Sequence, residues 1–278
     1  VYTLPFITDQ PQLITFTTTI TNVACNSGSS GAITFTNLLG GTGAYQYSID
    51  NGTTFQVSPN FTGLAAGTYN LAVMDANNCV VYGTAVVGQA PPLAFSSSVF
   101  DLTCFGNSTG VIQLAATGGM GGYEYSIDNG VTFSTTDSYF SLAAGTYSIA
   151  VRDVAMCQIT GTLVVNQPAA LQATYAPTAA TCNGVCDGQL AITASGGTVP
   201  YQYSVDNGVT FVTGSTIAGL CANTFAVLVK DSNNCQVTST QTITEPTAIT
   251  AAITLVSATC SAANGEIHIV ASGGTPNY

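Results

Sequence analysis

The chain has 278 residues and a formal net charge of −11, with 13 Asp or Glu against 2 Lys or Arg and a single His. Charged residues make up 5% of the sequence, far below the roughly 25% of an ordinary soluble protein. This composition excludes nucleic acid as a partner, because cationic side chains must displace the counterions of a phosphate backbone. No apolar run approaches the roughly 20 residues of a membrane-spanning helix. We therefore expect no membrane insertion in this segment.

Several sequence markers recur at one fixed spacing along the chain. The motif Tyr-Gln-Tyr-Ser-Ile-Asp-Asn-Gly at 45–52 returns in closely similar form at 123–130 and 201–208, with steps of 123 − 45 = 78 and 201 − 123 = 78. Cys104 and Cys182 keep the same step. A fixed period shared by many markers indicates tandem domains.

The period divides the chain into predicted domains. Residues 1–11 end a preceding repeat, 12–91 form repeat 1, 92–168 repeat 2, 169–246 repeat 3, and 247–278 begin a fourth repeat. The first residues match the end of a repeat, and the last stop inside the Tyr motif. We therefore expect the chain to be a piece of a longer array.

Within each repeat, short runs alternate apolar and polar residues between Gly, Asn and Pro, as in β-strands. In repeat 1, Ile33 and Phe35 flank Thr34, which predicts one buried face. The sequence Asp50-Asn51-Gly52 is typical of a tight hairpin. We count about seven strands per repeat and no sustained helical period. The predicted fold is all-β, with tandem small immunoglobulin-like β-sandwich repeats of about 78 residues.

Short linkers that contain Pro join the repeats, as at 88–93 and 166–171. Proline restricts its own φ and the conformation of the residue before it. Such linkers favour an extended, semi-rigid connection over free rotation. We therefore expect the repeats to be arranged as a rod.

Nine Cys in a chain almost without Lys indicate an oxidising, extracellular compartment. Small domains often need cross-links to be stable. A metal site requires ligands at short spacing, and among the cysteines only Cys182 and Cys186 have it. Disulfides are therefore favoured over a metal site. Cys186 and Cys221 occur only in repeat 3. A bond is the simplest reason for both to appear together, and we predict that they are paired.

The pairing of the other cysteines stays open between two arrangements. Pairing within repeats joins Cys25 to Cys79, Cys104 to Cys157, and Cys182 to Cys235. Pairing across junctions joins Cys25 to Cys157, and Cys104 to Cys235, because a repeat's two cysteines are expected at opposite ends of its strands, too far apart for a bond. In either arrangement we expect the partner of Cys260 outside this chain.

Two pairs of carboxylates are candidate calcium ligands. If repeats stack end to end, Asp50 approaches Asp153, and Asp128 approaches Asp231. Calcium takes six to eight oxygen ligands, and no Asp-rich ladder is present to supply them. The alternative, which we favour, is that each Asp stabilises its own turn.

Several motifs of repeat 3, taken together and in order, are similar to those of a known family. They are Cys-Asn-Gly-Val-Cys-Asp-Gly at 182–188, Ser-Gly-Gly-Thr-Val-Pro-Tyr-Gln-Tyr-Ser at 195–204, Gly-Leu-Cys-Ala at 219–222, Lys-Asp-Ser-Asn-Asn-Cys at 230–235 and Thr-Ile-Thr-Glu-Pro at 242–246. Over essentially its whole length the chain resembles the SprB-type repeat of Bacteroidetes cell-surface adhesins, which include gliding-motility filaments exported by type IX secretion. The resemblance implies an extracellular stalk or adhesive fibre at the bacterial cell surface and assigns no catalytic residue.

These observations predict a structural repeat segment of an extracellular adhesin or filament, a disulfide-stabilised semi-rigid stalk without enzymatic activity or cofactor. Its expected partners are neighbouring repeats of the same long chain, with other filament subunits or surface glycans as further candidates. Two alternatives stay open. The segment is either a glycan- or matrix-binding adhesion module with ligand contacts in its loops, or an accessory stretch of a secreted enzyme whose catalysis lies elsewhere.

Overall fold

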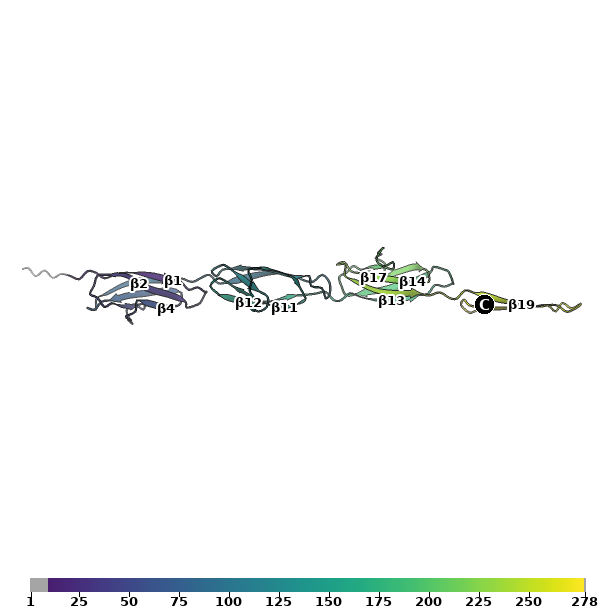
Figure 1. Ribbon diagram of the computed structural model, residues 1–278, viewed down its shortest axis with the longest axis horizontal. Helices are drawn as coiled ribbons and strands as arrows, with labels where there is room; N and C mark the ends of the chain where they lie inside the picture. The colour runs from purple at the N-terminus through teal and green to yellow at the C-terminus, as the bar shows by residue number, and fades with distance from the viewer. Residues whose placement is uncertain (1–9, 278) are drawn as a thin grey trace, which may run out of the picture. The chain divides into compact units, whose positions relative to one another are not determined.

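The computed structural model describes residues 10–277, and strands are the only regular elements in that range (Figure 1). The residues predicted to end a preceding repeat therefore lie mostly outside the described part, as does Tyr278. No helix within residues 10–277 is long and apolar enough to cross a membrane.

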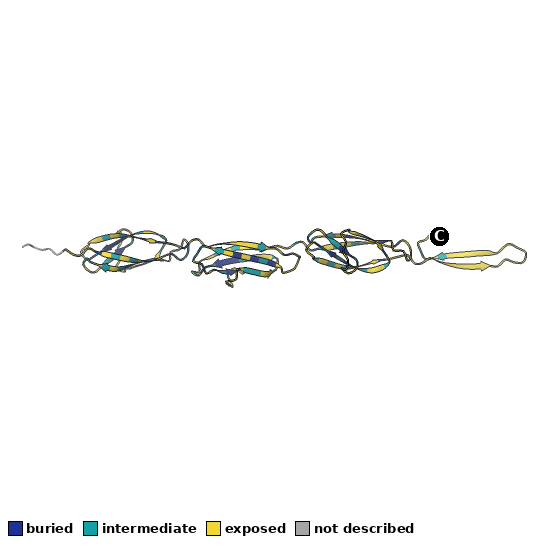
Figure 2. Ribbon diagram, turned by 90° about the horizontal axis from the view of Figure 1, so that it is seen from above, coloured by how far each residue is buried: buried dark blue, intermediate teal, exposed yellow. Residues whose placement is uncertain are grey.

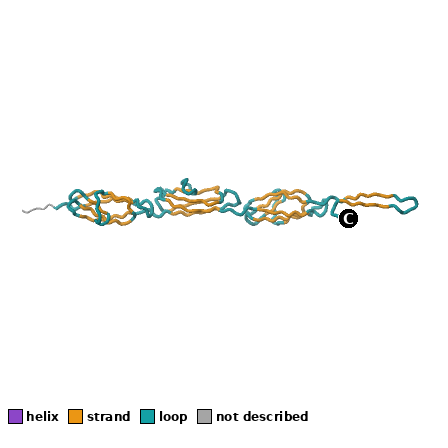
Figure 3. The backbone as a smooth tube through the Cα atoms, turned by 90° about the horizontal axis from the view of Figure 1, so that it is seen from below, coloured by secondary structure: helices purple, strands orange, loops and turns teal. Residues whose placement is uncertain are grey.

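Six strands recur in each of the three complete repeats, and two strands follow them (Figure 3). In repeat 1 they are β1 (Thr15–Thr21), β2 (Gly31–Leu39), β3 (Gln46–Ser48), β4 (Asn60–Leu64), β5 (Gly67–Met74) and β6 (Val80–Val87). In repeat 2 they are β7 (Ala94–Phe100), β8 (Gly110–Thr117), β9 (Glu124–Ser126), β10 (Ser138–Leu142), β11 (Gly145–Arg152) and β12 (Gln158–Val165). In repeat 3 they are β13 (Gln172–Thr178), β14 (Gly188–Ser195), β15 (Gln202–Ser204), β16 (Thr216–Leu220), β17 (Asn223–Lys230) and β18 (Gln236–Ile243), followed by β19 (Thr250–Val256) and β20 (Glu266–Ser272).

The count of six corrects the predicted count of about seven strands per repeat. In repeat 1 the segment between β3 and β4 makes an isolated bridge in place of a strand, in which Tyr47 and Gln56 exchange backbone hydrogen bonds of 2.8 and 2.9 Å. One bridged pair is too short to form a ladder.

Each complete repeat contains two three-stranded sheets. In repeat 1 their strand orders are β1-β2-β4 and β3-β5-β6, and all pairs are antiparallel. Repeat 3 has the equivalent orders β13-β14-β16 and β15-β17-β18, and repeat 2 has β10-β8-β7 and β12-β11-β9. The predicted all-β architecture of tandem small sandwiches is therefore present.

By contacts, the described residues form two compact units. Unit 1 takes the residues up to Val99 together with Val111–Phe140 and Thr146–Val164, and unit 2 takes Phe100–Gly110, Ser141–Gly145 and the residues from Val165 on. Repeat 1 lies entirely in unit 1 and repeat 3 entirely in unit 2.

The core of repeat 1 follows from the alternation of its strands. Ile33 and Phe35 on β2 are 0% and 3% exposed, and Leu71 and Val73 on β5 are equally buried. Phe35 packs against Tyr47 with a ring-centroid distance of 5.0 Å. Burial of such side chains contributes about 1.5–3 kcal/mol each, which makes the space between the two sheets the main source of stability.

The hairpin after β3 is closed by local polar contacts. Asn51 and Gly52 have φ values of 62° and 79°, as the Asp-Asn-Gly sequence predicted. The buried Ser48 hydroxyl donates to Asp50 Oδ1 at 2.6 Å and accepts from Gly52 N at 2.9 Å. The same hairpin recurs in repeats 2 and 3.

Strands β19 and β20 form a two-stranded sheet, and Figure 2 colours almost all of their residues as exposed. Ile267 and Ile269 alternate with His268 as Ile33 and Phe35 alternate with Thr34, but they are 68% and 65% exposed. Their counterparts Leu190 and Ile192 are buried because a second sheet packs on them. No second sheet covers β19 and β20 within the described residues.

Candidate functional site at the repeat junctions

Two disulfides join one repeat to the next, both across a junction. Cys25 is bonded to Cys157 with their Cα atoms 5.5 Å apart, and Cys104 is bonded to Cys235 with a Cα separation of 5.7 Å. Of the two arrangements that the sequence left open, the structure has the pairing across junctions. The within-repeat pairs Cys25–Cys79, Cys104–Cys157 and Cys182–Cys235 are not formed.

Strand length explains why pairing within a repeat does not occur. Cys79 immediately precedes β6. Cys25 lies near the other end of that strand, because Val23, two residues before it, is hydrogen-bonded to the segment just after β6. Val23 N donates to the Gly88 carbonyl, and the Val23 carbonyl accepts from Ala90 N. Eight residues of β6 at about 3.3 Å per residue cover roughly 26 Å. That separation exceeds the roughly 7 Å that a disulfide can bridge.

A third disulfide lies inside repeat 3. Cys186, just before β14, is bonded to Cys221, which lies between β16 and β17, over a sequence separation of 35 residues. Cys79, Cys182 and Cys260 are free and exposed among the described residues.

The turn that carries the first cysteine of each repeat is clamped by the linker that follows the same repeat. We call these the first-cysteine turns; they comprise residues 24–28, 103–107 and 181–185. Gly106 N donates to Gln167 Oε1 at 2.9 Å, and the equivalent bonds run from Ser27 N to Gln89 Oε1 at 2.9 Å and from Gly184 N to Glu245 Oε2 at 2.7 Å. This clamp was not predicted from the sequence, although Gln89, Gln167 and Glu245 recur with the period of the repeats.

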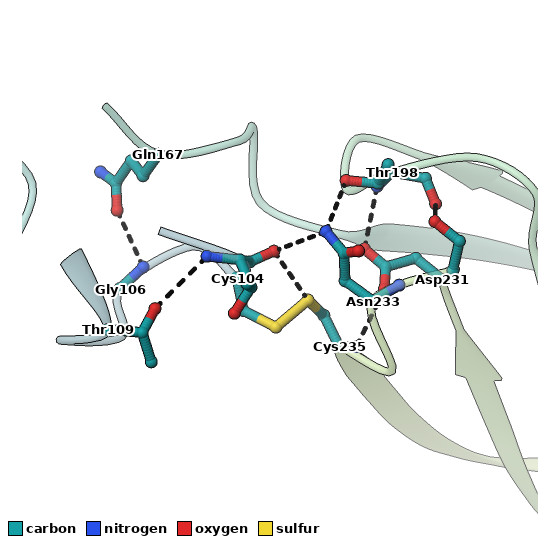
Figure 4. Close-up of a disulfide and its surroundings, with 10 residues drawn as sticks. Cys104, Gly106, Thr109, Gln167, Thr198, Asp231, Asn233 and Cys235 are labelled. Carbon is teal, nitrogen blue, oxygen red and sulfur yellow. Dashed lines mark hydrogen bonds between the residues drawn. A yellow bond between two sulfur atoms is a disulfide. The ribbon is translucent and has the colours of Figure 1, made fainter. Parts of the chain in front are cut away.

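The second cysteine of each repeat lies in a turn built around a buried carboxylate. Asp231 is 3% exposed, and it accepts three backbone N–H groups, those of Thr198, Asn233 and Cys235, each at 2.9 Å (Figure 4). We call these the Asp–Cys turns; they comprise residues 75–79, 153–157 and 231–235. Asp75 and Asp153 bind the same three positions at the same distances. Each carboxylate thus fixes the backbone from which the thiol projects.

Hydrogen bonding lowers the pKa of one of these carboxylates. The backbone N–H groups of Thr42 and Cys79 hold the pKa of Asp75 below its ordinary value, because they stabilise the ionised form more than burial disfavours it. Asp75 therefore carries its charge at neutral pH.

Further contacts surround the disulfide between Cys104 and Cys235. Asn233 Nδ2 donates to the Thr103 carbonyl at 3.0 Å and to Thr198 Oγ1 at 3.1 Å (Figure 4). Cys235 Sγ lies 3.4 Å from the Thr103 carbonyl oxygen, a contact without a proton because the sulfur is in a disulfide. The first-cysteine turn and the Asp–Cys turn therefore meet through polar contacts as well as a covalent bond.

The Gly-Gly turns, placed after β2, β8 and β14, hold the linkers from the other side. Gly119 N donates to Pro91 O at 3.0 Å, and Gly197 N donates to Ala169 O at 2.8 Å. At Gly118, where φ is 77°, an added Cβ would lie 1.9 Å from the Pro92 carbonyl oxygen. Only glycine permits this approach of the turn to the linker. Together with the clamp on the first-cysteine turn, these bonds attach each linker to the repeat before it and to the repeat after it.

The candidate calcium ligands are engaged in their own turns. Asp50 accepts from Ser48 Oγ and Thr54 Oγ1 at 2.6 Å, and these bonds lower its pKa to about 2. Asp128 makes the same contacts with Ser126 and Thr132 and also has a pKa of about 2. Among residues 10–277, no group of three or more His, Cys, Asp or Glu side chains is gathered that could hold a metal ion.

The two cationic side chains are both engaged. Arg152 Nε donates to Glu124 Oε2 at 2.6 Å and lies over the Phe133 ring at 4.0 Å. The Lys230 ammonium lies 4.0 Å from the centroid of the Phe211 ring. Each of these cations therefore packs on an aromatic ring of its own repeat.

A comparison with protein families finds matches at four positions. The model described as "SprB repeat" matches residues 17–54, 96–132, 174–210 and 252–278, which begin in the first strand of each repeat and run to the Tyr motif. No curated protein matches the chain.

Several solved structures are similar to the chain at low identity. "Sidekick-1 immunoglobulin domains 1-5" is 11% identical with a TM-score of 0.34, and the match covers 86% of this chain and 60% of that one. The N-terminal eight Ig domains of Down Syndrome Cell Adhesion Molecule isoform 1.30.30 are 11% identical with a TM-score of 0.35, over 81% of this chain and 36% of that one. This chain therefore spans less than two thirds of the length of either structure.

Proposed function

Because this chain belongs to the SprB repeat family, we propose that it is a non-enzymatic structural segment of an extracellular surface adhesin or filament, a disulfide-stabilised semi-rigid stalk. In this proposal the partners of each repeat are its neighbours along the chain. The bacterial cell surface, export by type IX secretion and gliding motility belong to the same proposal, on the strength of the family resemblance.

The observation that carries the proposal is the interleaving of the two junction disulfides. Cys25–Cys157 spans 132 residues and Cys104–Cys235 spans 131. The second loop begins before the first one ends. Neighbouring repeats are thus connected twice, by the backbone linker and by a disulfide, and each linker is hydrogen-bonded on both sides.

Interleaving sets a limit on how far the chain can be stretched. Along the backbone, the sequence separation of Cys25 and Cys235 is 235 − 25 = 210, but the route through both disulfides contains only the segment from Cys104 to Cys157, a separation of 157 − 104 = 53. At about 3.5 Å per extended residue these routes are roughly 740 and roughly 190 Å long. Even if every sandwich unfolds, the route through the two disulfides is taut at about a quarter of the length of the fully extended backbone. Beyond that point the two disulfides and the segment between Cys104 and Cys157 bear the tension. A stalk under tension requires this property, whereas an enzyme or a ligand-binding loop does not.

Single-molecule force spectroscopy on the oxidised chain tests the proposal. The extension between Cys25 and Cys235 should stop at roughly 190 Å in the unchanged protein. Cys25→Ser leaves a shortest route with a sequence separation of 104 − 25 = 79 and should stop at roughly 280 Å, and the reduced chain should reach roughly 740 Å. Equal extension of the oxidised and reduced chains would contradict a tension-bearing role.

A further inference from the structure

We propose that the outer face of the sheet β10-β8-β7 in repeat 2 is a binding site for a neutral glycan. In this site Phe140 stacks on a sugar ring, and Gln113 and Asp137 hydrogen-bond to its hydroxyl groups. The inference goes beyond the proposed function, because it gives the stalk a ligand of its own. The site lies on the strands of one repeat, whereas the alternative left open by the sequence had its ligand contacts in the loops.

A groove of about 480 Å³ lies on this face of the sheet, which is within the size range of small-molecule sites. Ile112 and Leu114 point into the core, where they are 0% and 3% exposed, so the side chain of Gln113 between them points outward. No Lys, Arg or His is among the described residues that line the groove. Its polar lining side chains are those of Ser96, Ser98, Gln113, Asp137 and Ser138.

The register of β8 against β10 places Gln113 beside Ser138. Leu114 N donates to the Asp137 carbonyl at 2.8 Å, and the equivalent bonds of repeats 1 and 3 measure 3.0 and 2.8 Å. In those two repeats the residue before the donor is paired with the residue after the acceptor. The same pairing in repeat 2 joins Gln113 to Ser138, and side chains paired in this way are about 5 Å apart.

Phe140 lies on the same face of the sheet as the groove. Tyr139, its neighbour on β10, is half-buried, and burial raises the pKa of its hydroxyl. Since Tyr139 faces inward, the alternation of side chains along the strand turns Phe140 outward, where it is 65% exposed. Phe140 follows Ser138 by two residues, which separates their side chains by roughly 7 Å along the strand. An exposed aromatic ring therefore borders the polar groove.

Several polar atoms of the groove are available to a ligand. The Gln113 carboxamide is exposed and has no hydrogen-bond partner among residues 10–277. Asp137 Oδ1 accepts from Ser138 Oγ at 2.8 Å, and Oδ2 of the same carboxylate makes no hydrogen bond within that range. The groove thus presents a carboxamide, which both donates and accepts, and a carboxylate oxygen, which accepts.

These groups favour an uncharged ligand that carries many hydroxyl groups. A carboxylate that accepts from a hydroxyl forms a hydrogen bond roughly twice as strong as a neutral one. The negative face of a Phe ring attracts the C–H groups on one face of a sugar ring, while its edge hydroxyls stay free to reach the groove. The net charge of −11 and the carboxylate in the groove both repel an anionic sugar. The chemistry of the face therefore selects a neutral glycan.

Only repeat 2 combines these side chains. The positions equivalent to Phe140 are Thr62 in repeat 1 and Ala218 in repeat 3, and those equivalent to Asp137 are Pro59 and Ser215. The same fold therefore accepts small side chains at both positions. Replacing Phe140 and Asp137 by the residues of the other repeats should leave the sandwich intact, which makes these substitutions suitable tests of binding.

Titration of the oxidised, isotope-labelled full chain with hexasaccharides, followed by NMR, tests the inference. The probes are four neutral hexasaccharides (cellohexaose, maltohexaose, mannohexaose and chitohexaose) and the anionic hexagalacturonate. We expect at least one neutral probe to shift the amide resonances of Ser98, Gln113, Asp137 and Phe140, and hexagalacturonate to shift none of them. Phe140→Thr should weaken that binding about tenfold because the stacking surface is lost. Asp137→Ser should weaken it about fivefold because a charge-assisted bond is lost.

A matched control separates this site from general stacking on exposed aromatic rings. Tyr82 is 61% exposed on β6 of repeat 1, and Tyr82→Thr should leave the affinity unchanged. Failure of all four neutral probes to bind, preference for hexagalacturonate, unchanged affinity with Phe140→Thr, or an equal loss with Tyr82→Thr would overturn the inference. None of these results would alter the extension limit of the chain, on which the proposed function depends.

Discussion

Repeat 1 and repeat 3 share the same six-strand plan but differ in their cross-links. Cys186–Cys221 closes a loop of 35 residues inside repeat 3, where repeat 1 has Ser29 and Ala65. Cys25–Cys157, in contrast, spans 132 residues and ties repeat 1 to the next repeat. The short bond acts on the stability of one sandwich, and the long bond acts on the connection between sandwiches. This chain therefore controls the two properties separately.

The largest expected effect comes from removing the bond inside repeat 3. Cys186→Ser together with Cys221→Ser should lower the free energy of unfolding of repeat 3 by about 4 kcal/mol, the chain-entropy value for a loop of this size. Repeat 1 should be unaffected, because its core is separate. Hydrogen exchange followed by mass spectrometry resolves the two repeats and measures both effects.

The reverse change sharpens the same comparison. Ser29→Cys with Ala65→Cys transplants the short bond into repeat 1 and should stabilise that repeat alone, by less than about 4 kcal/mol because introduced disulfides rarely match native geometry. Equal loss of protection in repeats 1 and 3 of the Cys186 and Cys221 double variant would show that the two repeats unfold as one unit.

A smaller effect is expected from the linker clamp. Gln167→Ala removes the acceptor of Gly106 N, which costs about 1 kcal/mol, and this should make the Cys104–Cys235 bond about fivefold easier to reduce. Timed reduction followed by peptide mapping measures the rate. Gln89→Ala is the matched control, since it should act on Cys25–Cys157 and leave Cys104–Cys235 unchanged. Gln167→Glu should restore the rate, because Glu245 fills this role in repeat 3.

The sequence predicted those features of the fold that depend on local pattern. The alternation around Thr34 placed Ile33 and Phe35 in the core, where they are 0% and 3% exposed, and the Asp-Asn-Gly sequence predicted the positive φ of Asn51 and Gly52. Both properties are decided by neighbouring residues in the chain. The same alternation places Ile267 and Ile269 on one face of β20, and they stay exposed because the described residues supply no second sheet to cover them.

The junctions depend on distances that no local pattern contains. Whether Cys25 meets Cys79 or Cys157 is decided by the length of β6 and by which ends of two repeats adjoin. The clamp by Gln167 was likewise not predicted, because its hydrogen bond to Gly106 joins residues far apart in the sequence. Nothing in the sequence around Gln167 indicates that the first-cysteine turn lies beside it. Its periodic recurrence with Gln89 and Glu245 was the available signal.

The smallest expected effect tests whether the junctions need anything besides covalent bonds and local hydrogen bonds. The Asp153 carboxylate already accepts hydrogen bonds from Met120 N, Ala155 N and Cys157 N at 2.9 Å. A calcium ion would have to replace these bonds, each of which contributes about 1 kcal/mol. It would also need several more oxygen ligands. We therefore expect excess EDTA to change the Tm of the oxidised chain by less than about 1 °C, as measured by circular dichroism. A fall of several degrees that added calcium reverses would assign Asp50 with Asp153, and Asp128 with Asp231, to metal binding.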